Sequence, residues 1–459
     1  MIFFTKREGS ILNYRRILLL IGVLTLVFTL VLTGCGAEEA ADKNEEDQEE
    51  KQEEEEQEAE NNDNNELEQI AWNQNTGNED YQDGTYRGVF SDGGEMQVNV
   101  QFTLEDNEIT DIDFRHLTYG GEDYLEPDDD TTEGLKEQHM ELLDYLEGED
   151  VRTGLAALYE PGGIVDDEVD GFSGATLRAN KISYAVRDGL NRGVYSFDDI
   201  PEGYNPVLGE SFEDGTYRGV FSDGGEMQVN VQFTLENNEI TEIDFRHLAY
   251  DGDDYLESEN ELVVGIKDQH KELLDYLEGT DIRDSLVDLY EPGEIVEDEV
   301  DGFTGATLRS NKIISAMKDG LNKGVYSGDI AEAYTPHPDY SFEDGTYRGI
   351  FEDGGEMQVN TQFTLEDNVI TEIGFRHLSY GGEDYLESDD DTIEGIKEQH
   401  KELIDHLEGT DIRVSLADLY EPGEIVEDDV DGFTGATLRS NKIIYSVVDG
   451  LNKGIYSQP

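Results

Sequence analysis

The sequence has almost no cysteine and comparatively little positive charge. Cys35 is the only cysteine in 459 residues, which excludes an internal disulfide, a cysteine-ligated iron–sulfur cluster and a Cys-x-x-Cys-His haem attachment. Lysine and arginine number 31 against 110 aspartates and glutamates, giving a formal net charge of −79. Such a surface repels phosphate backbones and argues against nucleic acid as a partner. The chemistry must therefore depend on hydroxyls, carboxylates, imidazoles or a bound cofactor.

The first 34 residues have the features of a secretory signal peptide. Four basic residues precede an apolar run at 17–32, which is marginal for a membrane span and is followed by small residues. The stretch "LTGC", residues 32–35, resembles the lipobox of bacterial lipoproteins, whose cysteine is acylated after cleavage. We therefore expect acylation of Cys35, insertion of the acyl chains into membrane lipid, and a location on the extracytoplasmic face of the cell membrane. An uncleaved N-terminal anchor is the alternative.

Residues 35–80 are expected to form a disordered acidic linker. Few of them can pack into a core, and one sign of charge dominates, so the segment should repel itself and extend as a stalk.

Three copies of one unit follow the linker. The motif "DGTYRG" starts at Asp83, and its second and third copies start 131 and then 130 residues later. A period this long indicates tandem domains rather than a solenoid. The predicted domains, called repeats 1, 2 and 3, are residues 81–197, 212–327 and 342–457. Segments containing proline and glycine separate them, and these linkers would allow the repeats to move independently.

Each repeat has an α+β pattern. Residues 96–105 alternate apolar and polar side chains, which predicts a strand with one buried face, and residues 109–117 predict its antiparallel partner. Apolar residues at helical spacing predict helices over 131–148 and 180–193, each ending at a glycine. We expect three antiparallel sheets with packed helices.

The loop "DGFSGATLRANK", residues 170–181, leads into the second of these helices. A helix N-terminus attracts phosphate, Gly174 and Ala175 would let a ligand approach the backbone, and Thr176 offers a hydroxyl there. Arg178 and Lys181 oppose the helix dipole unless an anion is bound beside them. The alternative is that Ser173 or Thr176 only caps the helix and that Arg178 is solvated.

The repeats resemble the FMN-binding domain family, known from the C subunit of the Na⁺-translocating NADH:quinone oxidoreductase, the G subunit of the Rnf complex and flavin-carrying lipoproteins of extracellular electron transfer. The resemblance rests on the "DGTYRG" opening, the segment "GGEMQVNVQFTLEDNEITDIDF" and the Asp-x-x-Ser/Thr-Gly-Ala-Thr loop. In that family a flavin transferase uses FAD to attach FMN, through its phosphate, to the last threonine of the loop.

The resemblance implies up to three covalent FMN groups. The implied attachment sites are Thr176, Thr307 and Thr437. The remaining motif residues are Asp170, Ser173, Gly174 and Ala175 in repeat 1, Asp301, Thr304, Gly305 and Ala306 in repeat 2, and Asp431, Thr434, Gly435 and Ala436 in repeat 3. Many family members have a hydroxyl residue two positions after the modified threonine, where this chain has Arg178, Arg309 and Arg439. An arginine there favours phosphate binding.

Three further sets of residues allow more than one interpretation. The tyrosines of "LYEPG" could stack on a flavin or belong to the core: Tyr159, Tyr290 and Tyr420. An Arg-His pair ends a predicted strand in each repeat, and its histidine could tune a flavin or be an ordinary hydrogen-bonded side chain: Arg115-His116, Arg246-His247 and Arg376-His377. The acidic stretches at 126–133 and 387–394 lack the spacing of a Ca²⁺ loop, so we interpret them as solvated and expect no metal site.

Two functional hypotheses follow. The first is a membrane-anchored electron carrier that passes electrons from a membrane oxidoreductase, or another quinone-linked donor, to extracellular acceptors. No nucleophile–base pair is visible, so we do not expect an enzyme with a substrate of its own. The second is an unflavinylated ligand-binding or spacer lipoprotein.

Overall fold

The computed structural model describes residues 80–165, 179–207, 209–296, 310–327, 341–426 and 440–457. All of them belong to one unit of chain, Ile70–Pro459. Within these residues, no helix has both the length and the apolar character that a membrane span requires.

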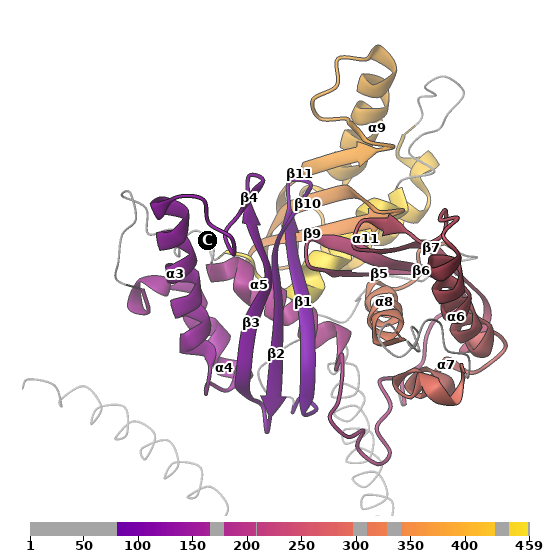
Figure 1. Ribbon diagram of the computed structural model, residues 1–459. Helices are drawn as coiled ribbons and strands as arrows, with labels where there is room; N and C mark the ends of the chain where they lie inside the picture. Colours follow the sequence, from indigo (N-terminus) through magenta and orange to yellow (C-terminus); the bar gives the residue numbers. More distant parts are fainter. Residues whose placement is uncertain are drawn as a thin grey trace, which may run out of the picture. The chain divides into compact units, whose positions relative to one another are not determined.

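Each repeat contains one four-stranded antiparallel sheet whose strands follow the order of the chain (Figure 1). The strands of repeat 1 are β1 Gly84–Asp92, β2 Glu95–Glu105, β3 Glu108–Tyr119 and β4 Glu122–Asp123. Those of repeat 2 are β5 Gly215–Asp223, β6 Glu226–Glu236, β7 Glu239–Tyr250 and β8 Asp253–Asp254. Those of repeat 3 are β9 Gly345–Asp353, β10 Glu356–Glu366, β11 Val369–Tyr380 and β12 Glu383–Asp384. The predicted hairpin is confirmed, and its turn has Asp106 and Asn107 in the left-handed region (φ 51° and 68°).

The helices also recur. Repeat 1 has α3 Asp130–Leu146, α4 Val151–Gly154, η1 Leu155–Tyr159, η2 Pro161–Gly163 and α5 Ala179–Arg192. Repeat 2 has α6 Glu261–Leu277, α7 Ile282–Ser285, η3 Leu286–Tyr290, η4 Pro292–Glu294 and α8 Ser310–Lys323. Repeat 3 has α9 Asp391–Leu407, α10 Ile412–Ser415, η5 Leu416–Tyr420, η6 Pro422–Glu424 and α11 Ser440–Lys453. Both predicted helices of repeat 1 are confirmed, and the chain leaves α3 through Gly148 at φ 81°.

The acidic stretches before the long helices act as helix caps. Asp129 accepts hydrogen bonds from the backbone N–H groups of Thr131 and Thr132 at the start of α3. Asp390 does the same in repeat 3, and Asn260 caps the corresponding helix of repeat 2. A side-chain acceptor at this position satisfies backbone donors that have no partner inside the helix. Asp129 and Asp390 are therefore solvated, as expected, and they also cap the long helices of their repeats.

The last helix of each repeat lies directly against the first strand (Figure 1). A Cβ atom on Gly88, the final residue of "DGTYRG", would come within 1.9 Å of the Ala185 carbonyl oxygen on α5. The equivalent distances at Gly219 and Gly349 are 1.8 and 1.9 Å. Only glycine permits this approach, which places α5, α8 and α11 at a fixed distance from their sheets.

The strand β2 differs from its prediction on one face. Val98, Val100, Phe102 and Leu104 are buried, as the alternation predicts, but Asn99 on the opposite face is also fully buried. Its amide donates to Gly88 O, and its Oδ1 accepts from the backbone N–H of Gly224 in repeat 2 at 3.5 Å. The polar face of the strand is covered because a neighbouring repeat packs against it.

The repeats contact one another in a closed cycle. Arg115 of repeat 1 pairs with Asp223 of repeat 2 at 2.9 Å. The equivalent pairs join repeat 2 to repeat 3 and repeat 3 to repeat 1: Arg246–Asp353 and Arg376–Asp92, both 2.8 Å. The first linker is also packed, since Val207 is fully buried and Pro206 O accepts from Lys318 Nζ at 3.0 Å. Within the described residues the three repeats thus pack against one another, and the described part of the first linker packs with them.

Candidate functional site

The loop that carries the implied attachment sites lies outside the described residues. This applies to Thr176, Thr307 and Thr437, to the other motif residues listed in the sequence analysis, to Arg178, Arg309 and Arg439, and to Cys35. The structure does describe the positions where the chain enters and leaves each loop. In repeat 1 the chain enters after Val165 and leaves into α5 at Ala179, and both of these residues are buried. Each loop therefore starts and ends at fixed points of the core.

A buried lysine stands in the first turn of the helix that follows each loop. Lys181 is 6% exposed, and its Nζ donates to Gln97 Oε1 on β2 at 2.5 Å. Lys312 and Lys442 make the same hydrogen bonds to Gln228 and Gln358. A cation at this end of a helix is opposed by the helix dipole and favoured by a nearby anion. The chemistry of this position fits a site for a phosphate-bearing group.

Aromatic rings surround each of these ammonium groups. Lys181 Nζ lies 5.5 Å from the centre of the Phe90 ring and 4.9 Å from that of Tyr119. The Phe90 ring is buried, whereas Tyr119, the last residue of β3, is 47% exposed. The sequence analysis did not identify Tyr119, Tyr250 or Tyr380. The sequence does contain a signal for them, because in every repeat the tyrosine stands directly before a "GG" or "DG" turn that follows the third strand.

The tyrosines of "LYEPG" have an identifiable structural role. Tyr290 Oη donates to Val194 O of repeat 1 at 2.5 Å, and Tyr420 Oη donates to Val325 O of repeat 2 at 2.6 Å. Tyr159 Oη closes the cycle by donating to Ile455 O of repeat 3. Each hydroxyl thus ties one repeat to the chain that follows the last helix of another. This supports the core interpretation of the three tyrosines.

The Arg-His pairs also lie where two repeats meet. Asp223 accepts from Arg115 and from Arg87, whose Nη1 is 3.0 Å away. The ring of His116 lies against Gly225, where an added Cβ would be 2.6 Å from Cε1. His247 and His377 face Gly355 and Gly94 in the same way. These residues contribute to contacts between repeats, and His116 Nε2 lies 3.2 Å from Thr118 Oγ1, as expected of an ordinary hydrogen-bonded side chain.

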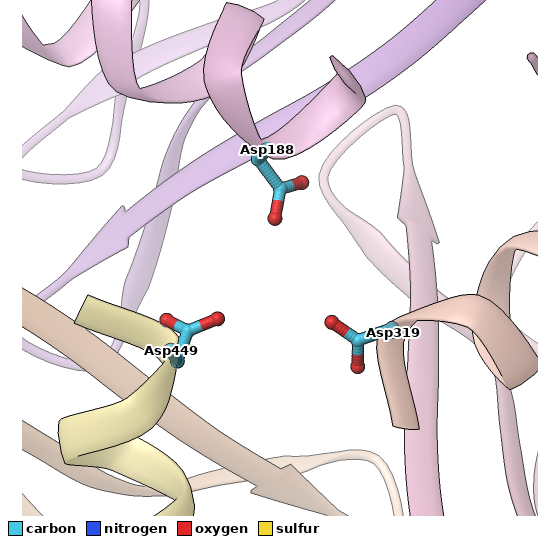
Figure 2. A group of neighbouring side chains, drawn as sticks. All are labelled: Asp188, Asp319 and Asp449. Carbon is cyan, nitrogen blue, oxygen red and sulfur yellow. The ribbon is translucent and has the colours of Figure 1, made fainter. Parts of the chain in front are cut away.

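The last helices bring three aspartates together at their C-terminal ends. Figure 2 shows Asp188, Asp319 and Asp449 pointing toward a common centre from α5, α8 and α11. One carboxylate oxygen from each lies within 4.8 Å of the others, and all three side chains are buried. The sequence analysis did not identify this cluster, because each aspartate is one of 110 acidic residues in the chain.

Three cations neutralise this cluster in a second closed cycle. Arg192 lies 2.8 Å from Asp188 in its own repeat and 3.2 Å from Asp319 in the next. Lys323 pairs with Asp319 at 2.9 Å and Asp449 at 3.6 Å, and Lys453 pairs with Asp449 at 2.9 Å and Asp188 at 3.4 Å. Each aspartate also accepts from a backbone N–H of its own sheet at 2.9 Å. These partners occupy the carboxylates, so we interpret the cluster as the centre of the assembly.

Burial and the charges at this centre shift the pKa values of Asp188 and Glu352. Burial alone would raise the pKa of Asp188, but Arg192 and Lys453 outweigh that effect and lower it to about 2. Glu352 of repeat 3 lies among the same cations, and its burial raises the pKa of its carboxyl to about 7 despite Lys323 and Lys453. Ser91 and Ser222 occupy the equivalent positions in repeats 1 and 2.

Comparison with known proteins identifies the family of the first two repeats. Residues 93–191 and 224–322 match the family model described as the FMN-binding domain. No curated protein and no solved structure matched the chain. The matched segments begin at the turn after the first strand and contain the other three strands of the sheet, the loop and nearly all of the last helix of their repeats. Residues 93–191 and 224–322 of this chain therefore belong to the FMN-binding domain family.

Proposed function

We propose that this protein is a flavoprotein electron carrier with FMN attached through its phosphate to Thr176, Thr307 and Thr437. The single observation that carries the proposal is the match of the family model to residues 93–191 and 224–322. The third repeat has the same strands, helices, buried lysine and exposed tyrosine, which supports a third site of the same kind. Bound FMN accepts and returns electrons, and the protein's part is to hold it and tune its potential.

The described residues support a phosphate-bearing cofactor at the start of the last helix. The dipole of α5 favours an anion at the N-terminus of the helix, and the buried Lys181 adds a positive charge two residues into the helix. The chain carries a large excess of negative charge, so this local cation opposes the general repulsion of anions. Arg178, Arg309 and Arg439 would add to it beside each attachment threonine.

The partners of the carrier are part of the same proposal. A flavin transferase with FAD as donor would load the sites, and a membrane oxidoreductase or another quinone-linked donor would reduce them. Acylation at Cys35 would hold the protein in membrane lipid on the extracytoplasmic side, and extracellular acceptors would reoxidise it. The protein itself would catalyse no reaction on a dedicated substrate.

The test is to count the attached flavins. The chain is produced together with an active flavin transferase and examined by denaturing electrophoresis, flavin fluorescence and intact mass. We expect three added FMN masses, and the loss of one mass in each of Thr176→Ala, Thr307→Ala and Thr437→Ala. Thr110→Ala, at an exposed position on β3, is the matched control and should retain all three. An unmodified mass in the presence of a transferase that modifies another acceptor would overturn the proposal and favour a ligand-binding or spacer protein.

A further inference from the structure

The segment between α5 and β5 is packed against both of the repeats that it joins. At one end Phe197 packs against the core of repeat 1, and at the other end Val207 is fully buried in the core of repeat 2. We call residues 197–207 the strap, and we call the contact between repeats 1 and 2 the 1/2 interface; the other two contacts are the 2/3 and 3/1 interfaces. Because both of its ends are anchored, the strap spans the 1/2 interface.

An aromatic cluster joins the middle of the strap to the 1/2 interface. The ring centre of Tyr204 lies 4.7 Å from that of Phe197 and 6.0 Å from that of Tyr290 in repeat 2, and the Phe197 and Tyr290 ring centres are 5.3 Å apart. Tyr290 is the residue whose hydroxyl donates to Val194 O of repeat 1. Ring contacts of this kind stabilise a structure beyond the area that they bury. The strap therefore packs on the tyrosine that ties repeat 2 to repeat 1.

Hydrogen bonds hold the remainder of the strap on repeat 2. The Asn205 amide donates to Arg283 O on α7 at 2.5 Å, and Asn205 Oδ1 accepts from the backbone N–H of Val207 at 3.0 Å. Lys318 Nζ on α8 donates to Pro206 O at 3.0 Å. Within the described residues the strap contains no helix and no strand. Each of its contacts involves a side chain, so the strap can be released without breaking a sheet.

The last helices distinguish the 1/2 interface from the other two. Tyr184 Oη of repeat 1 donates to Gly454 O of repeat 3, across the 3/1 interface. Tyr445 Oη of repeat 3 donates to Gly324 O of repeat 2, across the 2/3 interface. The equivalent residue of repeat 2 is Ser315, which is buried but too short to reach as far as a tyrosine hydroxyl. The 1/2 interface therefore has a serine where the other two have a tyrosine anchor.

We propose that the strap takes the place of this tyrosine and locks the 1/2 interface. Tyr204 supplies a ring against Tyr290, and Pro206 O accepts a hydrogen bond from α8, the helix that carries Ser315. The tyrosine anchors hold the other two interfaces independently of the strap. Release of the strap therefore opens the ring of repeats at the 1/2 interface alone, and the segment acts as a latch.

The test measures the separation of the repeats in the full chain. Pairs of nitroxide labels are placed on the long helices at three equivalent exposed positions, Glu141→Cys, Glu272→Cys and Glu402→Cys, in a Cys35→Ser background. Pulsed electron paramagnetic resonance then gives one distance distribution for each interface. The measurement does not require a flavin, so its outcome is separate from that of the proposed function.

Release of the strap is tested with Tyr204→Ala combined with Asn205→Ala. We expect the distribution between repeats 1 and 2 to broaden toward longer distances, and the other two distributions to keep the widths of the parent. Asp199→Ala changes an exposed residue of the strap and is the matched control, expected to match the parent in all three. Parent-like distributions in the double variant would overturn the proposal. Broadening of all three would also overturn it, because the strap would then support the whole fold.

A further variant tests whether the strap replaces the tyrosine. Ser315→Tyr, added to the double variant, gives the 1/2 interface the anchor that the other two have. We expect the distribution between repeats 1 and 2 to narrow again to the width of the parent. A distribution that stays broad would refute the replacement, and with it the proposal.

Discussion

The two ends of the last helix in each repeat are built differently. At the N-terminal end, a lysine, its glutamine partner and the tyrosine above it are identical in all three repeats. At the C-terminal end the aspartates are identical, but the neighbouring cation is Arg192 in repeat 1 and a lysine in the other two. The facing residue on the first strand also changes, from serine to Glu352.

This difference shows which residues each end depends on. The lysine, glutamine and tyrosine of the N-terminal end come from one repeat, so each copy has the same set, although Phe90 beside Lys181 stacks on Tyr456 of repeat 3. The C-terminal end is completed by all three repeats, so the charges there need only balance as a group. A substitution at the N-terminal end should affect one site, and a substitution at the C-terminal end should affect the whole assembly.

Removing one central aspartate is the strongest test of this comparison. Asp188→Ala leaves Arg192 and Lys453 buried with less negative charge and deprives the backbone N–H of Val89 of its acceptor. The free energy of unfolding should fall by about 3 to 5 kcal/mol, as measured by urea denaturation. Asp80→Ala removes the exposed carboxylate that pairs with Arg152 and should leave the midpoint unchanged. Equal midpoints for the two variants would show that the cycle does not stabilise the assembly.

The next effect is a pH dependence that originates in repeat 3. Burial raises the pKa of Glu352 from 4.5 to about 7. The positive charges of Lys323, Lys453 and Arg192 oppose this rise, and the negative charge of Asp319 adds to it. Between these two values the folded state holds a proton that the unfolded state has released, so stability falls as the pH rises from about 4.5 to about 7. The loss amounts to about 3 kcal/mol.

Glu352→Gln measures this contribution directly. The variant and the parent should have similar free energies of unfolding near pH 4.5, and the variant should be the more stable of the two at pH 8. The repulsion among the remaining acids changes with pH in both proteins, so the difference isolates Glu352. A difference that stays constant from pH 4.5 to pH 8 would contradict the prediction.

The ion pairs between the sheets should have an intermediate effect. Asp223→Ala removes the acceptor of Arg87 and Arg115 and should cost about 2 kcal/mol of unfolding free energy. Asp353→Ala and Asp92→Ala should cost about the same, because the three contacts are equivalent in geometry. Urea denaturation of the three variants tests this equivalence. Asp111→Ala, which removes an exposed aspartate on β3, is the control and should keep the free energy of unfolding of the parent. A much smaller cost for Asp92→Ala alone would mean that the cycle is open between repeats 3 and 1.

The smallest effect on stability belongs to the N-terminal ends. Tyr119→Ala should change the free energy of unfolding by no more than about 0.5 kcal/mol, because nearly half of this side chain is exposed. Combining it with Tyr250→Ala and Tyr380→Ala should still leave a cost well below that of Asp188→Ala. A large loss in the triple variant would assign these tyrosines to packing.

The sequence predicts local structure well in this chain and predicts contacts between repeats poorly. The alternation of β2 and the helical spacing in α3 and α5 are periodic signals, and all three segments form as predicted. In that alternation Asn99 falls on the face that is expected to be exposed. It is buried because another repeat packs against this face. The family resemblance was also visible, because its motif lies in one continuous loop.

Of the candidate site, the sequence proposes only the attachment threonines, and that prediction lies outside the described residues. Thr176 is proposed from a contiguous motif, whereas Tyr119 and Lys181 are 62 positions apart and meet because β3 ends where α5 begins. Asp188 is still harder to find, since its partner Lys453 lies in a different repeat. Spacing along a chain carries no information about pairs that only the assembly brings together.

The closed cycle of repeats has a consequence for how the chain acquires its structure. Asp92 receives its partner Arg376 only after 284 further residues have been added, so the first domain to emerge keeps an incomplete, charged surface until the third has folded. A contact of such separation slows the final step relative to the folding of each sheet. Folding of the separate repeats should therefore be complete well before the cycle closes, and the chain should reach its final stability only after the third repeat has folded.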